Sequence, residues 1–138
     1  MIRVVRLGSK RAANEGVRLG TVRKPPRGVP KAEYAKRNIY DVWLPTLAPS
    51  DALLKQALRI SETDERGWQQ FFRKYRAEMK APAARHLLDA LAALSQQTNF
   101  SVGCYCAKES HCHRSVLRQL LIDCGAKVAP APRGDKAQ

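Results

Sequence analysis

The segment Phe100–Cys124, FSVGCYCAKESHCHRSVLRQLLIDC, decides how the fold of this chain is interpreted. It begins with an apolar stretch typical of a buried strand, continues through a short polar loop rich in Cys and His, and ends with helical periodicity. A strand, a loop and a helix N-terminus in this order place side chains at the carboxyl edge of a sheet. Open α/β proteins usually bind ligands there, and the helix dipole favours anions. We therefore expect the functional site in this segment.

Apolar patterns along the rest of the chain predict short strands that alternate with helices. We expect strands at 2–7, 17–22, 40–44 and 100–106, and helices at 51–60, after the Thr63-Asp64 cap, at 82–96, and from before Val116 to Cys124. An aromatic stripe at helical spacing, which includes Trp68 and Tyr75, predicts a helix that packs into the core. The order of elements favours an α/β fold. We expect a three-layer sandwich whose small sheet is mostly parallel or mixed and is flanked by helices.

The length and composition indicate one globular domain. The chain has 138 residues, of which 44% are hydrophobic and 27% are charged. We expect a single domain at 1–128 and a flexible C-terminal tail at 129–138 that is rich in Pro and charge. There is no apolar run of 18 residues and no signal-peptide pattern, so we expect a cytoplasmic protein with reduced thiols and no membrane contact.

A strong excess of basic residues points to an anionic partner. Twenty-five Lys and Arg face 12 Asp and Glu, which gives a formal net charge of +13. Such a charge attracts polyanions, although it also simply solubilises a surface. The expected partner is therefore a nucleic acid or a phosphorylated small molecule.

Two segments carry the residues that we expect to contact an anion. The loop at 23–31, RKPPRGVPK, places Arg27 among other cations and stiffening prolines. Lys108, His113 and Arg114 lie beside the free N–H groups that begin the last helix, where a phosphate or carboxylate is favoured. The alternative is that His113 and Arg114 bond to loop carbonyls and hold the loop closed.

The cysteines of the same loop suggest an enzyme as the alternative function. Cys106 or Cys112 would be the nucleophile, with His113 as the base and Arg114 holding the substrate, because nearby cations and a helix N-terminus lower a thiol pKa. The loop lacks the spacing of a phosphatase, since Lys108 stands where that motif needs a cysteine. A C-x-x-C redox motif is also absent.

A metal site is the third interpretation of this loop. Cys104 and Cys106 are two apart on the expected strand and so point to the same face. Cys106, His111, Cys112 and His113 offer enough N and S donors for a tetrahedral zinc ion, although their spacing is irregular for a zinc module. Cys104 itself is predicted to be a small core residue, since free cysteine is among the most buried residue types. The sequence specifies no cofactor.

Motifs spread over most of the chain resemble the YeaO-like family of uncharacterised bacterial proteins. They comprise Arg18, Pro26-Arg27-Gly28-Val29, Lys31, Trp43-Leu44, Leu47-Ala48-Pro49-Ser50, Leu53, Phe72, Tyr75, Glu78, and the last strand, loop and helix. The resemblance implies a compact α/β fold and an Arg-bearing pocket between the Pro-Arg-Gly and Cys-His-Arg loops, with no agreed activity. Many relatives have Asp-Arg-Leu-Trp before Pro-Arg-Gly, where this chain has Val22-Arg23-Lys24-Pro25.

Overall fold

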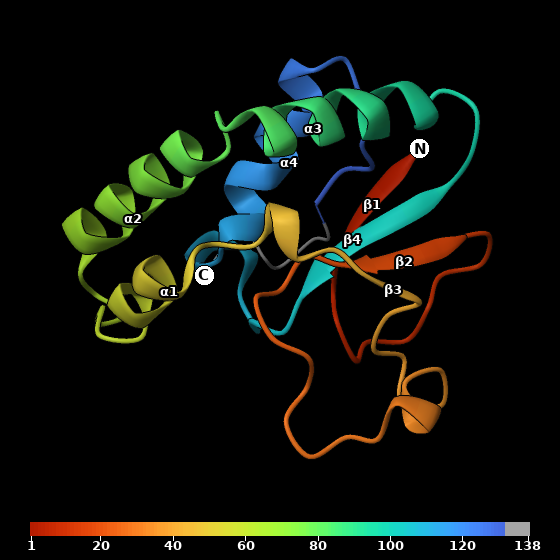
Figure 1. Ribbon diagram of the computed structural model, residues 1–138, viewed down its shortest axis with the longest axis horizontal. Helices are drawn as coiled ribbons and strands as arrows, with labels where there is room; N and C mark the ends of the chain where they lie inside the picture. Colours follow the sequence, from red (N-terminus) through yellow and green to blue (C-terminus); the bar gives the residue numbers. More distant parts are fainter. Residues whose placement is uncertain (132–138) are drawn as a thin grey trace.

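The computed structural model describes residues 1–131 and shows a small sheet packed against helices (Figure 1). The strands are β1 (Ile2–Arg6), β2 (Val17–Gly20), β3 (Val42–Trp43) and β4 (Phe100–Cys104). The α-helices are α1 (Asp51–Ala57), α2 (Glu65–Glu78), α3 (Pro82–Leu94) and α4 (His113–Asp123), and the 3-10 helices are η1 (Lys31–Glu33), η2 (Pro45–Leu47) and η3 (Glu109–His111). The predicted α/β sandwich is confirmed.

The four strands form one parallel sheet in the order β1-β4-β2-β3. Strand β4 lies inside the sheet, since Phe100 is paired with Ile2 of β1 on one side and with Val17 of β2 on the other. Because all strands run in the same direction, the loops that follow β2 and β4 leave the sheet side by side at its carboxyl edge. The sequence left a mixed sheet open, and the described residues form a parallel one.

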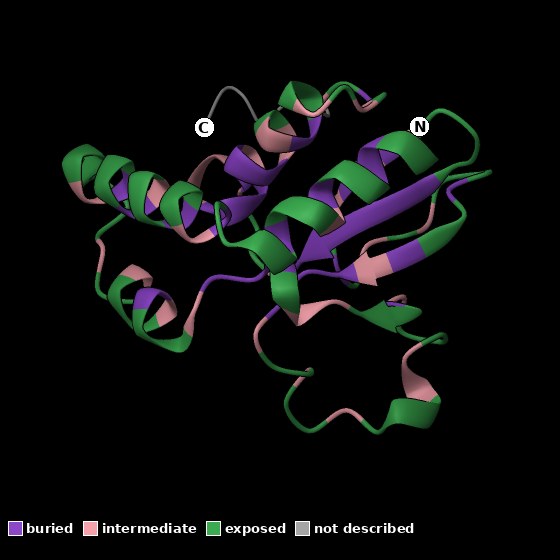
Figure 2. Cartoon of the chain, turned by 45° about the horizontal axis from the view of Figure 1, so that its top comes forward, coloured by how far each residue is buried: buried purple, intermediate pink, exposed green. Residues whose placement is uncertain are grey.

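The main core lies between the helices and one face of the sheet. Alternate strand residues, such as Ile2, Val4 and Val102, are buried there against α2, α3 and α4. Figure 2 shows that β4 is buried along its length while the outer surfaces of the helices are exposed. The aromatic stripe of α2 packs into this core, as predicted, and Tyr75 is buried with its hydroxyl donating to the carbonyl of Leu47 at 2.7 Å.

A buried ion pair covers the opposite face of the sheet. The guanidinium of Arg18 is fully buried and lies 2.8 Å from the carboxylate of Glu15, which also accepts from the hydroxyl of Ser101. Two backbone carbonyls, of Ser9 and Asn38, accept from the rest of the guanidinium. Burial alone would raise the pKa of Glu15, but the hydrogen bonds from Arg18, the Ala12 N–H and Ser101 outweigh it and hold that pKa below 4.5.

The end of the described chain is held against the sheet. Val128 forms a parallel bridge with Ile2, and Ala129, which the sequence placed in the tail, is buried and donates its N–H to the carbonyl of Ile2. Positions 132–138 of the predicted tail lie outside the described residues. Within residues 1–131, every helix is too short or too polar to cross a bilayer.

Candidate ligand cavity and thiol cluster

A cavity of about 520 Å³ lies at the carboxyl edge of the sheet. Because β2 and β4 are neighbours, the loops that follow them form two of its walls, and α1 and α2 form the rest. Its volume lies within the usual range of small-molecule sites. The lining residues include Arg23, Lys24, Pro25, Pro26 and Arg27 from the first loop, Leu54, Leu58, Trp68 and Phe71 from the helices, and Cys104, Cys106, His111, Cys112 and His113 from the second loop.

The first loop brings three cations to the cavity, and they differ in their surroundings. Arg23 donates to the carbonyls of Pro45, Ala48 and Pro49 at 2.9 to 3.2 Å, so it fastens the loop to η2. Lys24 and Arg27 are exposed, and within residues 1–131 neither side chain has an ion-pair or hydrogen-bond partner. These two charges are therefore available to a ligand.

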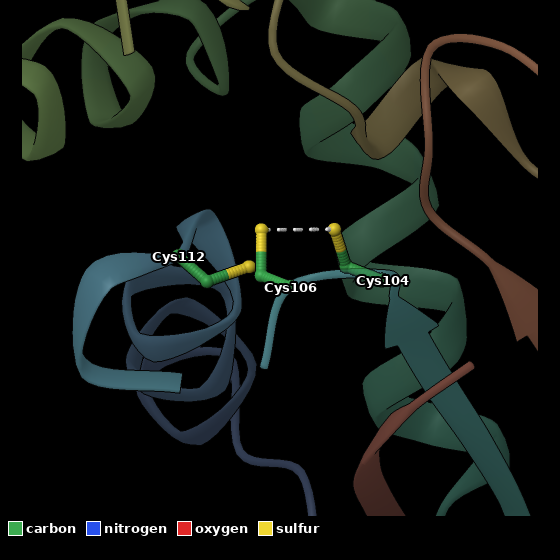
Figure 3. A group of neighbouring side chains, drawn as sticks. All are labelled: Cys104, Cys106 and Cys112. Carbon is green, nitrogen blue, oxygen red and sulfur yellow. Dashed lines mark hydrogen bonds between the residues drawn. The ribbon is translucent and has the colours of Figure 1, made fainter. Parts of the chain in front are cut away.

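Three cysteines that line the cavity lie close together (Figure 3). Cys104 ends β4, Cys106 follows two residues later, and Cys112 is the N-cap residue of α4. Their three sulfur atoms all lie within 4.8 Å of one another, and those of Cys104 and Cys106 are 3.8 Å apart. Cys104 and Cys112 are buried and Cys106 is exposed. The end of β4, the loop that follows it and the start of α4 thus bring three thiols together.

The cluster favours one thiolate. Burial alone would raise the pKa of Cys112, but contacts with the Cys104 and Cys106 thiols, the charge of Arg114 and the Arg114 backbone N–H hold it well below 9. The pKa of Cys104 is raised by its contacts with the other two sulfurs and by burial. The hydrogen bond with Cys104 lowers the pKa of Cys106. The hydrogen bond with Cys112 and burial raise it by more, so the pKa of Cys106 is also raised. Cys112 is therefore the first of the three to ionise.

The imidazole of His113 lies beside Cys112. Its Nε2 is 2.8 Å from the carbonyl oxygen of Thr21, which can only accept, so Nε2 carries the proton and Nδ1 does not. Nδ1 lies 3.7 Å from the sulfur of Cys112. Burial lowers the pKa of His113 to about 4, so the ring is neutral at neutral pH. His113 thus lines the cavity as a neutral hydrogen-bonding group.

Two of the predicted anion contacts lie elsewhere. Arg114 is buried beneath the loop, donates to the carbonyl of Cys106 at 2.7 Å and lines a separate hollow beside Arg3. Lys108 is half-buried, lies 3.4 Å from Glu62 and does not line the cavity. The structure therefore brings Arg27, Cys106, Cys112 and His113 to one cavity and places Lys108 and Arg114 outside it. The loop carbonyls accept from His113 and Arg114, which was the alternative role for these residues.

His111 lies on the helix side of the cavity. Its ring is stacked on Trp68, with ring centroids 4.8 Å apart and planes 3° from parallel. Nε2 is 3.7 Å from Glu65, while Nδ1 is buried and has no hydrogen-bond partner among the described residues. Such an unpaired buried atom is uncommon in a folded protein.

Sequence reasoning did not identify three of the residues that line the cavity as parts of the site. Lys24 belongs to the predicted basic loop but was not selected, because nothing in the pattern distinguishes the cations that face the cavity from the one that anchors the loop. Cys104 was predicted to be a small core residue, and it is buried, but it also lines the cavity. Trp68 was assigned to the core, and its contact with His111 depends on tertiary packing.

These observations define a parallel α/β sandwich with a cation-rimmed cavity and a thiol cluster at the carboxyl edge of its sheet. A sequence model of the family described as the "Active DUF488-N3 subclade" (DUF488-N3a) matches residues 2–125, and the chain belongs to this family. The YeaO-like resemblance agrees with this assignment, because YeaO is a member of DUF488. No curated protein and no solved structure matches the chain.

Proposed function

We propose that the cavity binds an anionic, phosphate-bearing ligand. The observation that carries this proposal is that Lys24 and Arg27 line the same cavity, with no acidic partner among the described residues. A cation at the mouth of an apolar cavity interacts with an anion more strongly than it would in open water. The net charge of +13 raises the local concentration of anions around the protein.

The rest of the cavity limits the shape of that ligand. Leu54, Leu58 and Phe71 form an apolar wall beside the ring of Trp68, so a bound molecule gains by placing an apolar or aromatic body there. A volume of about 520 Å³ accommodates one small molecule. We therefore favour a phosphorylated small molecule with an apolar part. Of a nucleic acid, only a single nucleotide would fit into the cavity.

Calorimetric titration of the full chain tests this proposal, with adenosine monophosphate and inorganic phosphate as probes. We expect the nucleotide to bind more tightly than phosphate, because only the nucleotide fills the apolar wall. Replacing both cations, in Lys24→Gln/Arg27→Gln, should weaken binding by at least roughly 100-fold, since each hydrogen bond to a charged group contributes about 1.5 to 3 kcal/mol. Added salt should weaken binding by the wild type.

Lys36→Gln/Arg73→Gln is the matched control. It removes the same number of charges from exposed positions that do not line the cavity. If both double variants lost affinity equally, the binding would depend on overall charge and the assignment to this cavity would be wrong. Binding of a single-stranded oligonucleotide but not of the monophosphate would contradict the small-molecule assignment.

A separate observation favours thiol catalysis as a second candidate function. His113 is oriented by the carbonyl of Thr21 so that its unprotonated Nδ1 faces the sulfur of Cys112 at 3.7 Å. A base that a third group orients toward a nucleophile is the arrangement that nucleophilic catalysis requires. In this reaction the sulfur of Cys112 adds to a carbonyl carbon of the ligand as the C=O π electrons move to its oxygen, and Nδ1 of His113 accepts the proton that the Cys112 thiol releases. Cys106, which is exposed in the same cavity, is the competing nucleophile.

Iodoacetamide labelling of the native chain, with mass spectrometry to locate the label, distinguishes these thiols. We expect Cys112 to be labelled faster than Cys124, which lies outside the cavity, and His113→Gln to slow the labelling of Cys112 alone. A label confined to Cys106 would transfer the nucleophilic role to that residue. An unchanged rate at Cys112 in the variant would remove His113 as its base.

A further inference from the structure

We propose that Cys104, Cys106 and Cys112 together bind one thiolate-preferring metal ion, and that Zn²⁺ is the ion that fits these donors best. This inference goes beyond the proposed function, because it concerns the floor of the cavity and needs no anionic ligand. Three cysteine sulfurs form a soft donor set, which selects zinc or copper(I) over magnesium or calcium. Zn²⁺ is preferred here because the spacing of the three sulfurs matches that of a tetrahedral zinc site.

The distances between the sulfurs match a tetrahedral site. With Zn–S bonds of about 2.3 Å, two sulfurs of a tetrahedral zinc ion are about 3.8 Å apart. The sulfurs of Cys104 and Cys106 are 3.8 Å apart, and all three lie within 4.8 Å of one another. In Figure 3 the side chain of Cys112 points from α4 toward Cys106, so the three thiols converge from two elements. The spacing of the three sulfurs is therefore close to the spacing that a bound zinc ion requires.

The backbone holds these donors in place without a metal. Cys104 is fixed by the pairing of β4 with its two neighbours, and Cys112 donates its N–H to the carbonyl of Glu109. Arg114 connects the two parts of the loop, since its guanidinium donates to the carbonyl of Cys106. A site on rigid elements loses little conformational entropy when it binds an ion.

The charges around the cluster suit three bound thiolates. One Zn²⁺ and three thiolates carry a net charge of −1, and binding releases the protons that the thiols still hold. The cationic side chain of Arg114 lies beneath the loop, and its Nε is buried without a hydrogen-bond partner among the described residues. The guanidinium therefore offers both a compensating charge and an unused donor to this cluster.

The fourth coordination position faces the cavity. Within residues 1–131, the group of clustered ligands contains these three cysteines and no His or carboxylate. Cys106 and Cys112 both line the cavity, so the open side of the ion would be turned toward water or a bound ligand there. Three protein ligands and one open position are typical of catalytic zinc sites, whereas structural sites have four protein ligands.

Titration of the metal-free full chain with Zn²⁺ alone, against a chromophoric chelator, tests the inference. We expect one ion per chain for the wild type and for Cys124→Ser, which is the matched control because Cys124 is outside the cluster. Cys106→Ser changes an exposed residue and should weaken Zn²⁺ binding by at least roughly 100-fold. Losing a residue that only hydrogen-bonds to a metal ligand costs up to about 100-fold in affinity, and losing a ligand should cost at least as much. Equal affinity of Cys106→Ser and Cys124→Ser would overturn the proposal.

Co²⁺ provides a second measurement that needs no variant. Cobalt bound by the three thiolates of the wild type should give intense thiolate-to-cobalt charge-transfer absorption, and the absence of this absorption would overturn the site.

A bound ion would also occupy the thiolate of Cys112, so Zn²⁺ should protect Cys112 from iodoacetamide while Cys124 still reacts. Unchanged labelling of Cys112 in saturating Zn²⁺ would contradict the site. Neither measurement uses the anionic ligand, so failure here is distinct from failure of the proposed function.

Discussion

Two groups of buried polar side chains lie beside β4, and they differ in how well their hydrogen bonds are satisfied. In the Glu15–Arg18 pair, both side chains are fully engaged with each other, with Ser101 and with backbone groups. At the thiol cluster, three sulfurs share weak contacts, and the nearby His111 Nδ1 and Arg114 Nε have no partner within the described part of the chain. A satisfied network is complete as it stands and stabilises the fold, whereas an incomplete one gains from a ligand.

The largest expected effect comes from breaking the satisfied pair. Glu15→Gln leaves the buried guanidinium of Arg18 without a compensating charge, and we expect a loss of about 3 to 5 kcal/mol in the free energy of unfolding. Urea denaturation followed by circular dichroism measures this loss. Glu33→Gln removes an exposed partner of Arg37 and should cost less than about 1 kcal/mol. Equal losses would show that burial does not distinguish the two pairs.

The same pair predicts how stability depends on pH. The pKa of Glu15 is lowered in the folded state, so its contribution is fully present above its usual value of 4.5 and is lost as the pH falls through the folded value. Asp41, whose pKa Arg11 and the Arg18 backbone N–H lower, acts in the same direction. Glu15→Gln should therefore show a shallower decrease of stability in acid than the wild type. A parallel decrease in both proteins would mean that Glu15 does not titrate in this range.

A smaller change in the free energy of unfolding is expected at the thiol cluster, where it depends on Zn²⁺. A Zn²⁺ concentration about 100-fold above the dissociation constant should stabilise the wild type by about 2.7 kcal/mol, because the ion binds the folded state. Cys106→Ser should be nearly as stable as the wild type without metal, since its side chain is exposed, and should gain much less from Zn²⁺. Thermal unfolding with and without Zn²⁺ measures both. Equal stabilisation of the two proteins would place the metal somewhere other than this cluster.

Much of the architecture follows from local patterns in the sequence. The predicted helix starts are confirmed at Ser50, whose hydroxyl accepts from the N–H of Leu53, and at Asp64, which caps α2 in the same way. Gly125 ends the last helix region with a φ of 88°, a conformation that glycine adopts readily. These features depend on residues within a few positions of one another, so they can be recognised without the fold.

The candidate site was only partly predictable, because its parts are distant in the sequence. Arg27, Cys106, Cys112 and His113 were identified by their residue type and their place in two loops. Neither loop reveals which of its cations point inward, since that depends on the carbonyls of η2, which bind Arg23, and on Glu62, which lies beside Lys108. Arg114 was expected to face a ligand, but the packing of α4 buries it beneath the loop.

By itself, the sequence determined the strand, the loop and the helix of residues 100–124 and the excess of positive charge. These properties follow from alternation, helical periodicity and residue type, which act over short distances along the chain. Only the tertiary structure decided that β2 lies beside β4, so that Lys24 and Arg27 meet the thiols across one cavity. Strand order is set by the burial of side chains from the whole chain, and no local pattern contains it.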